Sequence, residues 1–544
     1  MSDAAAGGVR VEVTGELADL ADAALNTLIA DDVAGQLAGG NPALWGPEAE
    51  GEARRRLGWL QLAESSRPLL GPLAELRAAL TDAGLDRVVL CGMGGSSLAP
   101  EVICAAAGVP LVTLDSTDPA QVAAALIELP RTVVVISSKS GGTLETDSQH
   151  RAFRAAFQAA GIDPAQRIVV VTDPGSPLEA SATEAGVLAI FRADPNVGGR
   201  YSALTAFGLV PSALAGVAVE GLLDAAQQVY DTLGSPDGPA LLLGAALGAG
   251  ALAGRNKLVL ADAGSGLANF GDWAEQLIAE STGKNGRGLL PVVVESAAAA
   301  GFAAAPDRQR VVLGSPGTGV PEPSGIGVSG PLGGQFLAWE FATAIAGRLL
   351  AIDPFDQPNV QESKDNTNRL LSDAGDGPLP APVPAFTDGP IEVYAEPALL
   401  GGASTLAEAV AALLGAVPAG GYLAVMAYLN RAAEPTAAQL RQLLAARTPA
   451  SVTFGWGPRF LHSTGQFHKG GPQIGGFLQV TAEPDQVLPI PGRNFDFGKL
   501  QSAQALGDVQ ALAGRGRPVL RVHLTDRAAG LAALLTAAGA SGCS

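Results

Sequence analysis

The chain has 544 residues, of which 47% are hydrophobic, so it is long enough for roughly two to four domains that each bury a core. Its formal net charge of −19 repels polyanions, which argues against nucleic acid and anionic membranes as partners. Glycine (70 residues) and proline (38) are abundant, but no Gly-X-Y period is present, so a collagen-like chain is excluded.

The three cysteines, Cys91, Cys104 and Cys543, lie at unrelated spacings that suit neither a disulfide framework nor a CxxC metal clip. This pattern fits a reducing cytoplasm, where we expect the protein. The chain starts without a basic stretch before an apolar run, and its longest apolar segment, near residues 239–254, is short and broken by glycines. Neither a signal peptide nor a membrane span is expected.

Residues 1 to about 80 are predicted to be mostly helical. Short apolar runs then alternate with Ala-rich amphipathic segments, which is typical of βαβ units in a parallel sheet covered on both faces. The first group of runs is RVVLCG, PLVTLDS, TVVVISS, RIVVVTD and VLAIFRA. These runs predict a doubly wound domain.

A second α/β domain is predicted from the strand-like runs KLVLAD, LLPVVVE and RVVLG, with helices before, between and after them. A third has strand-like runs IEVYAE, YLAVMAYL, SVTFGW, FLQVTAE and VLRVHL, with helices between the first four and before the last. The predicted segments are a helical N-terminus (1–80), two α/β domains (81–235 and 236–372), a Pro-rich linker (373–389) and a C-terminal α/β domain (390–544).

The chain has only six lysines, and four of them lie in clusters rich in Gly, Ser, Thr, Glu or Gln: Lys139, Lys284, Lys364 and Lys469. Arginine supplies most of the basic residues. Two of the four histidines, His462 and His468, share the Lys469 cluster. Such grouping predicts binding or catalytic sites at these clusters.

Two glycine- and hydroxyl-rich clusters each follow a predicted strand and precede a predicted helix. The first spans residues 91–97 (CGMGGSS) and the second residues 137–146 (SSKSGGTLET). Hydroxyls, a lysine and the free N–H groups of a helix N-terminus suit a phosphate monoester at the carboxyl end of parallel strands. The GxxxxGK[ST] pattern is absent, so nucleoside triphosphate hydrolysis has no support.

Three more motifs follow in order: GGRYS at 198–202, EQLIAESTGK at 275–284 and FDQPNVQESK at 355–364. Together the five motifs resemble the glucose-6-phosphate isomerase family, which has the sugar isomerase (SIS) fold. The stretch GPRFLHSTGQFHKGGP resembles the isomerase half of bifunctional transaldolase/phosphoglucose isomerase proteins. The resemblance implies an α/β protein with two doubly wound parallel-sheet SIS domains (three-layer αβα) and a C-terminal α/β domain.

The resemblance also implies the activity: interconversion of glucose 6-phosphate and fructose 6-phosphate by ring opening and proton transfer through a cis-enediolate, without metal or cofactor. By the same match the substrate phosphate is held by loop hydroxyls and one lysine, namely Ser138, Ser140, Thr143 and Lys139. Gly95 and Ser96 match positions beside the sugar. The expected partner is this sugar phosphate, and the family implies a possible homodimer.

Moving a carbon-bound proton needs a carboxylate base, and Glu280 matches the base of the family. Gln276 lies one helical turn before it on the same face. Arg200 matches the cation that stabilises the enediolate. Gln357 and Lys364 match residues near the ring oxygen and hydroxyls, and on one helix their spacing of seven would place both toward one cleft.

Ring opening normally uses a histidine, and here the sequence departs from the common family pattern. The usual Gly-Gln-His motif is missing, because no histidine occurs between Glu280 and Gln357. We therefore expect a loop of the third domain to supply the proton shuttle, through His468 first and His462 second. His150 and His523 receive no function.

Two alternatives stay open at this stage. A dual phosphoglucose/phosphomannose isomerase would share the loop and the base, and would differ at the configuration of C2. A noncatalytic sugar-phosphate sensor could keep the hydroxyl loop, but it would not need Glu280, Arg200 and Lys364 together. A transaldolase is disfavoured, since it requires a Schiff-base lysine in a barrel and the pattern predicts open sheets.

Overall fold

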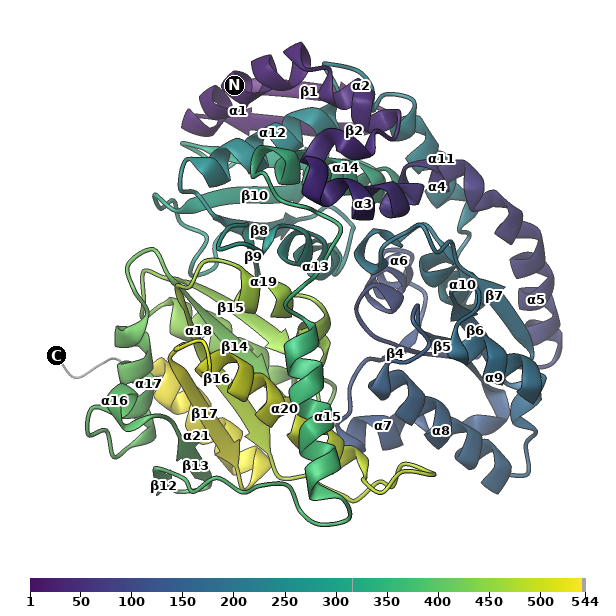
Figure 1. The fold of residues 1–544 in the computed structure, drawn as a ribbon, viewed down its shortest axis with the longest axis vertical. Helices are drawn as coiled ribbons and strands as arrows, with labels where there is room; N and C mark the ends of the chain where they lie inside the picture. The colour runs from purple at the N-terminus through teal and green to yellow at the C-terminus, as the bar shows by residue number, and fades with distance from the viewer. Residues whose placement is uncertain (316, 541–544) are drawn as a thin grey trace. The chain divides into compact units, whose positions relative to one another are not determined.

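The computed structural model describes residues 1–315 and 317–540, so Cys543 lies outside the described residues. Three sheets flanked by helices form the α/β fold that the sequence predicts (Figure 1). The chain divides into two compact units. Unit 1 contains Met1–Asp115, Leu126–Ala297 and Ala304–Gln357, and unit 2 contains Ser116–Ala125, Ala298–Ala303 and Pro358–Ser544.

The first sheet of unit 1 is entirely parallel, as expected for the first α/β domain. In spatial order its strands are β4 (Val112–Leu114), β3 (Arg87–Gly92), β5 (Thr132–Ser137), β6 (Ile168–Thr172) and β7 (Ala189–Arg192). The accompanying helices are α6 (Leu98–Ala106), α8 (Leu144–Ala159), α9 (Pro177–Ala185) and α10 (Ala206–Ala215). Every strand coincides with one of the predicted apolar runs.

The topology of this sheet brings two sequence motifs together. Strand β3 lies between β4 and β5, so the order of the strands reverses there. Gly92 at the end of β3 is paired with Ser137 at the end of β5. The loops that follow these two strands therefore leave the same edge at the switch point, where doubly wound sheets bind ligands.

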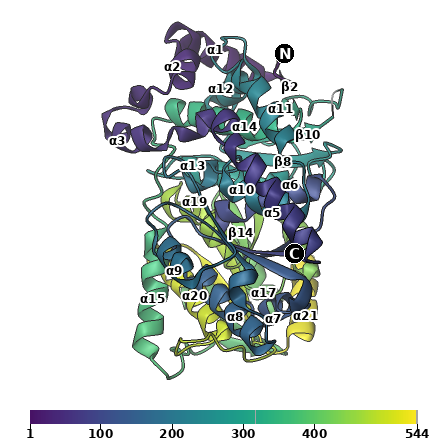
Figure 2. The same ribbon diagram turned by 90° about the vertical axis from the view of Figure 1, so that its right-hand side faces the viewer.

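The second sheet of unit 1 carries the predicted strands β8 to β10 and three further ones. Its order is β1 (Ser2–Ala6), β2 (Val9–Thr14), β11 (Gly325–Ser329), β10 (Arg308–Gly314), β8 (Lys257–Ala263) and β9 (Leu290–Val294). Its helices are α11 (Glu220–Tyr230), α12 (Pro239–Leu252), α13 (Phe270–Thr282) and α14 (Leu332–Leu349). Helices α12 and α14 pack on each other (Figure 2).

The first fourteen residues correct the prediction of a helical N-terminus. They form the hairpin β1–β2, and β2 pairs antiparallel with β11. The segment VRVEVT alternates apolar and polar residues, a strand period, and Val9, Val11 and Val13 are buried. The remainder is helical as predicted: α1 (Glu16–Ala30), α2 (Val33–Ala38), α3 (Pro47–Arg56), α4 (Leu62–Ser65) and α5 (Leu70–Asp82).

Unit 2 is built on one mixed sheet. Its strands are β12 (Phe386–Asp388), β13 (Ile391–Tyr394), β17 (Val519–Leu524), β16 (Gly475–Ala482), β14 (Tyr422–Ala427) and β15 (Ser451–Trp456). Its helices are α7 (Pro119–Ala125), α15 (Gln361–Ala374), α16 (Pro397–Leu400), α17 (Leu406–Ala416), α18 (Gln439–Ala445), α19 (Gly465–Gly470), α20 (Phe497–Ala513) and α21 (Arg527–Gly539). The expected linker at 373–389 thus contains a short strand, and α15 belongs to this unit.

No helix within residues 1–315 and 317–540 is both long and apolar enough to cross a membrane.

One carboxyl in the core of unit 1 leads to a stability prediction. Glu340 on α14 is fully buried, and burial raises its pKa well above the usual 4.5. Because a raised pKa makes the contribution of this group to stability fall as pH increases, we expect Glu340→Met to raise the unfolding free energy, and to raise it more at pH 7 than near pH 4.5. Urea denaturation at both pH values measures this, and a destabilised variant would contradict it.

Candidate active site

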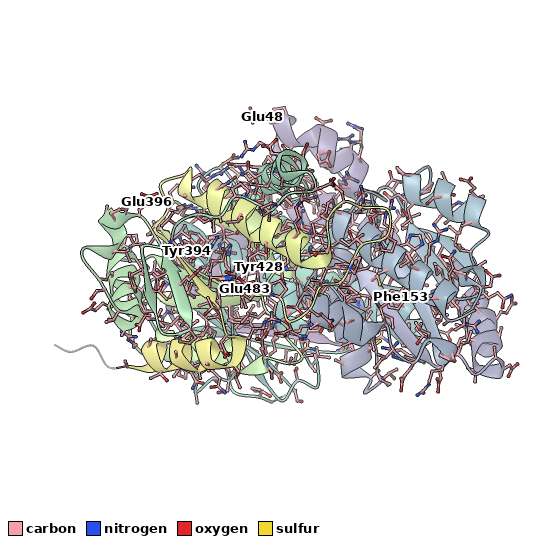
Figure 3. The ribbon with its side chains drawn as sticks, turned by 90° about the horizontal axis from the view of Figure 1, so that it is seen from below. Glu48, Phe153, Tyr394, Glu396, Tyr428 and Glu483 are labelled. Atoms are coloured by element: carbon pink, nitrogen blue, oxygen red, sulfur yellow. The ribbon has the colours of Figure 1, made fainter. Side chains whose placement is uncertain are left out.

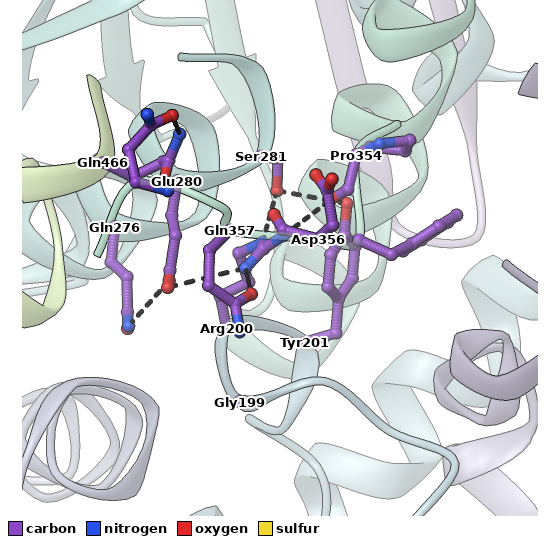
Figure 4. Close-up of polar contacts among 12 residues, drawn as sticks. Gly199, Arg200, Tyr201, Gln276, Glu280, Ser281, Pro354, Asp356, Gln357 and Gln466 are labelled. Carbon is purple, nitrogen blue, oxygen red and sulfur yellow. Dashed lines mark hydrogen bonds and ion pairs between the residues drawn. The ribbon is translucent and has the colours of Figure 1, made fainter. Parts of the chain in front are cut away.

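Arg200 is the centre of a cluster of polar groups in unit 1 (Figure 4). It lies in the short helix η7 (Gly199–Tyr201) and is 3% exposed. Its Nε donates to Ser281 Oγ at 2.9 Å, and its NH1 donates to Gln357 Oε1 at 2.8 Å. Its NH2 donates to the carbonyls of Pro354 and Asp356 at 2.9 and 2.7 Å. The guanidinium is therefore fixed in one orientation, as electrostatic stabilisation of a developing anion requires.

Helix α13 places a carboxylate beside this guanidinium. Glu280 Oε1 lies 3.5 Å from Arg200 NH1, and its side chain is 13% exposed. Gln276 Nε2, one turn earlier, donates to Glu280 Oε2 at 3.2 Å. The predicted common face of Gln276 and Glu280 is confirmed, and the carboxylate keeps access to solvent.

A second buried cation holds the segment that carries Gln357. Lys284 Nζ donates to the carbonyls of Asp353 and Asp356, both at 2.6 Å, and forms an ion pair with the Asp356 carboxylate. Burial and the nearby Arg200 charge lower the pKa of Lys284 to about 8. Arg200 and Lys284 thus share the Asp356 carbonyl, a contact that no sequence motif indicated.

Two glycine-containing turns meet at the edge of this site. A Cβ built on Gly95 would lie 1.9 Å from the carbonyl oxygen of Gly199, so only glycine permits the approach of η4 (Gly94–Ser96) to η7. Ser96 in the same turn is buried. The turn after β3 is therefore packed directly against the residue that precedes Arg200.

This contact predicts a position-specific stability loss. Gly95→Ala must push the two turns apart, and we expect the unfolding free energy to fall by about 1–3 kcal/mol. Gly142→Ala is the matched control, because a Cβ there meets nothing within 4 Å. Thermal and urea unfolding of both variants test this, and equal stability of the two would contradict the packing.

The predicted phosphate loop leads from β5 into α8. Ser138 Oγ and Thr143 Oγ1 lie 3.1 Å apart, and Ser138 is buried whereas Ser140 is exposed. Lys139 Nζ is paired with Asp173 Oδ2 at 2.5 Å. The structure thus brings two of the expected hydroxyls together and neutralises the lysine charge with a neighbouring carboxylate.

Three predicted site residues, Lys364, His462 and His468, belong to unit 2. Lys364 is exposed on α15, and His462 is half-buried at the end of the short helix η9 (Arg459–His462). Gln357 precedes α15, so the expectation that Gln357 and Lys364 share one helix is wrong. The physical reason is Pro358, since a residue before proline is disfavoured in the α conformation.

His468 is placed as a packing residue of unit 2. It is 2% exposed, its Nδ1 lies 3.0 Å from the Tyr422 hydroxyl, and its ring stacks on Tyr422. Burial, with the charge of Lys469, lowers its pKa well below the usual value. Lys469 is also buried, and its Nζ lies 2.7 Å from Asp508 Oδ1. These contacts do not favour His468 as the proton carrier, and they leave His462 as the more accessible histidine.

Comparison with known proteins shows what parts of this chain resemble. A family model described as phosphoglucose isomerase matches residues 77–285. A protein of Haloarcula marismortui described as a probable glucose-6-phosphate isomerase is 33% identical over 297 residues. The glucose-6-phosphate isomerase of Thermosynechococcus vestitus is 37% identical over 210 residues. The matched part of the chain is thus similar to glucose-6-phosphate isomerases.

The family match covers only part of either sequence. The aligned segments span 52% and 36% of this chain, and 65% and 40% of the lengths of the two relatives. The match to the glucose-6-phosphate isomerase family model includes the phosphate loop, Arg200 and Glu280, and ends just after Lys284. Gln357, Lys364, His462 and His468 lie beyond it.

Solved structures of related fold extend the comparison. A hypothetical protein from Thermus thermophilus superposes with a TM-score of 0.56 at 23% identity, over 66% of this chain and all of that chain. A glucose-6-phosphate isomerase from Chlamydia trachomatis superposes with a TM-score of 0.53 at 19% identity, over 68% of this chain and 90% of that chain. These likenesses show that the chain shares the α/β fold of glucose-6-phosphate isomerases.

Proposed function

We propose that the protein interconverts glucose 6-phosphate and fructose 6-phosphate. The observation that carries the proposal is the placement of Glu280 beside Arg200, with Gln276 as the third member of the group. A carboxylate and a fixed guanidinium 3.5 Å apart suit removal of a proton from a carbon next to a carbonyl. The matched family model and the names of the relatives point the same way.

In this reaction Glu280 takes the proton from C2 of the open-chain aldose and returns it to C1. The electron pair of the C–H bond forms the C1–C2 double bond and the carbonyl π pair moves to the C1 oxygen, which gives the cis-enediolate that Arg200 stabilises. The O2 proton passes to O1 when the carbon-bound proton returns to C1. Gln357, bonded to Arg200, would contact the sugar hydroxyls, and the hydroxyls of the phosphate loop would hold the distal phosphate. For ring opening we favour His462, because imidazole is the usual proton carrier near neutral pH and His468 is buried.

A direct assay tests the proposal. The purified protein is supplied with fructose 6-phosphate, and the formation of glucose 6-phosphate and of mannose 6-phosphate is measured in parallel. We expect glucose 6-phosphate alone. Formation of both products would identify a dual-specificity isomerase, and tight binding without turnover would identify a sensor.

The low pKa of Lys284 gives the reaction an alkaline limit. Below about pH 8 its charge holds the 353–357 segment, and above it the ion pair with Asp356 is lost. We therefore expect kcat/KM to fall with an apparent pKa near 8, and Lys284→Arg to move that fall to higher pH. Folding lowers the pKa of Lys284, so between about pH 8 and 10.5 the unfolded chain binds more protons than the folded chain. Lys284 by itself therefore makes the unfolding free energy rise with pH in that range. A parallel fall of stability and activity would point to general unfolding instead.

A further inference from the structure

Strand β17 carries apolar residues on one face and a basic residue on the other. Its run VLRVHL has the period of a strand, and Leu520, Val522 and Leu524 lie in the core of unit 2. Arg521 therefore projects from the opposite face. Arg517 lies just before the strand and precedes a proline, which favours an extended backbone. The two arginines thus lie on the same face, with their Cα atoms about 13 Å apart.

Neither arginine forms an ion pair with a carboxylate in the described part of the chain. Arg517 is 6% exposed, and its NH2 donates to the carbonyls of His468 and Pro472 at 3.2 and 3.3 Å. Its Nε and NH1, and the Nε of Arg521, are buried without a hydrogen-bond partner among the described residues. The Arg521 guanidinium carbon lies 4.0 Å from the ring centre of Tyr394, which Figure 3 labels. Because a buried cation without a counter-ion is unfavourable, this arrangement favours binding of an anion.

Both arginines line a cavity of about 920 Å3 in unit 2. Val519, between them on the same strand face, also lines it, together with Leu506 and Val509 of α20. One acidic residue is present among the described lining residues, and it is exposed. The cavity therefore places an apolar stretch between two cations, in a chain whose net charge is −19.

The Pro-rich segment forms one wall of this cavity through residues 380–383. Before this segment, Lys499 Nζ donates to the Gly375 carbonyl at 2.6 Å. After it, Ala385 N donates to the Val393 carbonyl at 2.8 Å. Since the segment is held at both ends and proline-rich chain is stiff, the cavity is largely preformed, as small-molecule sites usually are.

A neighbouring cavity of about 500 Å3, which Arg521 also lines, has a different charge. Three carboxylates line it, those of Glu392, Glu483 and Asp496, and they outnumber its lysine and arginine. An anion is therefore expected on the side of Arg521 that faces Arg517.

We propose that the larger cavity binds an elongated organic dianion, with one acid group at Arg517, the other at Arg521, and an apolar body between them against Val519 and α20. Arginine binds carboxylate and phosphate groups alike through paired hydrogen bonds, so either can supply the acid groups. The site lies in unit 2 and shares no residue with the Arg200–Glu280 group. It is a binding function beyond the proposed isomerase reaction.

Calorimetric titration with matched acids tests the proposal. Decanedioate carries two carboxylates on a long apolar chain, decanoate carries one on the same chain, and butanedioate carries two on a short chain. We expect decanedioate to bind at least about tenfold more tightly than either, because each of the others loses a charged contact or the apolar body. Decane-1,10-diyl bisphosphate, titrated alongside, shows whether phosphate groups bind more tightly than carboxylates.

Arg517→Gln and Arg521→Gln each remove one charge, and we expect each to weaken the Kd of decanedioate by at least about tenfold. Arg493→Gln makes the same change at an exposed position of unit 2 and should leave Kd unchanged. Thermal unfolding checks that the variants are folded. Arg517→Gln loses two contacts to backbone carbonyls, so Arg521→Gln decides the matter if Arg517→Gln is unstable.

Three results would overturn the proposal: failure of the wild type to bind either dianion, equal affinity for decanoate and decanedioate, or an unchanged Kd in the folded arginine variants. Binding is measured here without turnover. A wild type that binds decanedioate but does not isomerise fructose 6-phosphate would therefore contradict the proposed isomerase and support the dianion site.

Discussion

Glu280→Gln is expected to reduce kcat by at least about 10²–10⁴-fold while leaving substrate binding nearly intact. The amide has the shape of the carboxylate and can still accept from Gln276 Nε2, but it cannot take a proton from carbon. Isomerisation of fructose 6-phosphate gives kcat, and the Kd of 6-phosphogluconate reports binding by a ligand that is not turned over.

Glu275→Gln is the matched control for this substitution. It makes the same change five residues earlier on α13, on a part of the helix about 140° away from Glu280. We expect it to retain the activity of the wild type. If Glu280→Gln kept a substantial part of kcat, the base would have to be another group and the proposed chemistry would be wrong.

Arg200→Lys has the second largest expected effect, although it conserves the charge. The guanidinium makes four hydrogen bonds in fixed directions, and an ammonium on a flexible stem cannot reproduce them. We expect kcat to fall by about 10²–10³-fold, since the enediolate loses its oriented cation. Loss of donors to the Pro354 and Asp356 carbonyls should also lower the unfolding free energy by about 1–3 kcal/mol.

Arg192→Lys controls for the change of residue type. The Arg192 side chain is 60% exposed and contacts Glu179 at the surface, so its replacement should affect neither activity nor stability measurably. An active Arg200→Lys enzyme with an unchanged unfolding midpoint would show that the position needs only positive charge, which would contradict the fixed geometry argued from Figure 4.

The sequence predicts the elements of the fold better than the contacts of the site. Long apolar runs correctly placed the strands of the parallel sheet, because such runs have few alternative structures. The pairing of Gln276 with Glu280 was predictable from helical spacing alone. The prediction of a helical N-terminus is wrong for residues 2–14, although VRVEVT has a strand period, because the helical pattern of the longer segment that follows outweighs these few residues.

Contacts between distant parts of the chain could not be read from local patterns. The sharing of the Asp356 carbonyl by Arg200 and Lys284 joins segments 156 and 72 residues apart, and no spacing rule connects them. Likewise, the motif around His468 does not reveal that Tyr422 covers the ring. The identity of the polar residues was informative, whereas their exposure depended on tertiary packing.

The pairing of β2 with β11 has a consequence for how the protein is made. Thr14 and Gly325 are hydrogen-bonded but lie 311 positions apart, so β2 is synthesised long before its partner strand β11 exists. Long-range pairing of this kind slows folding. Strand β11 would also become an open sheet edge if the first fourteen residues were removed, and open edges promote aggregation. Deleting residues 1–14 to improve expression would therefore be counterproductive.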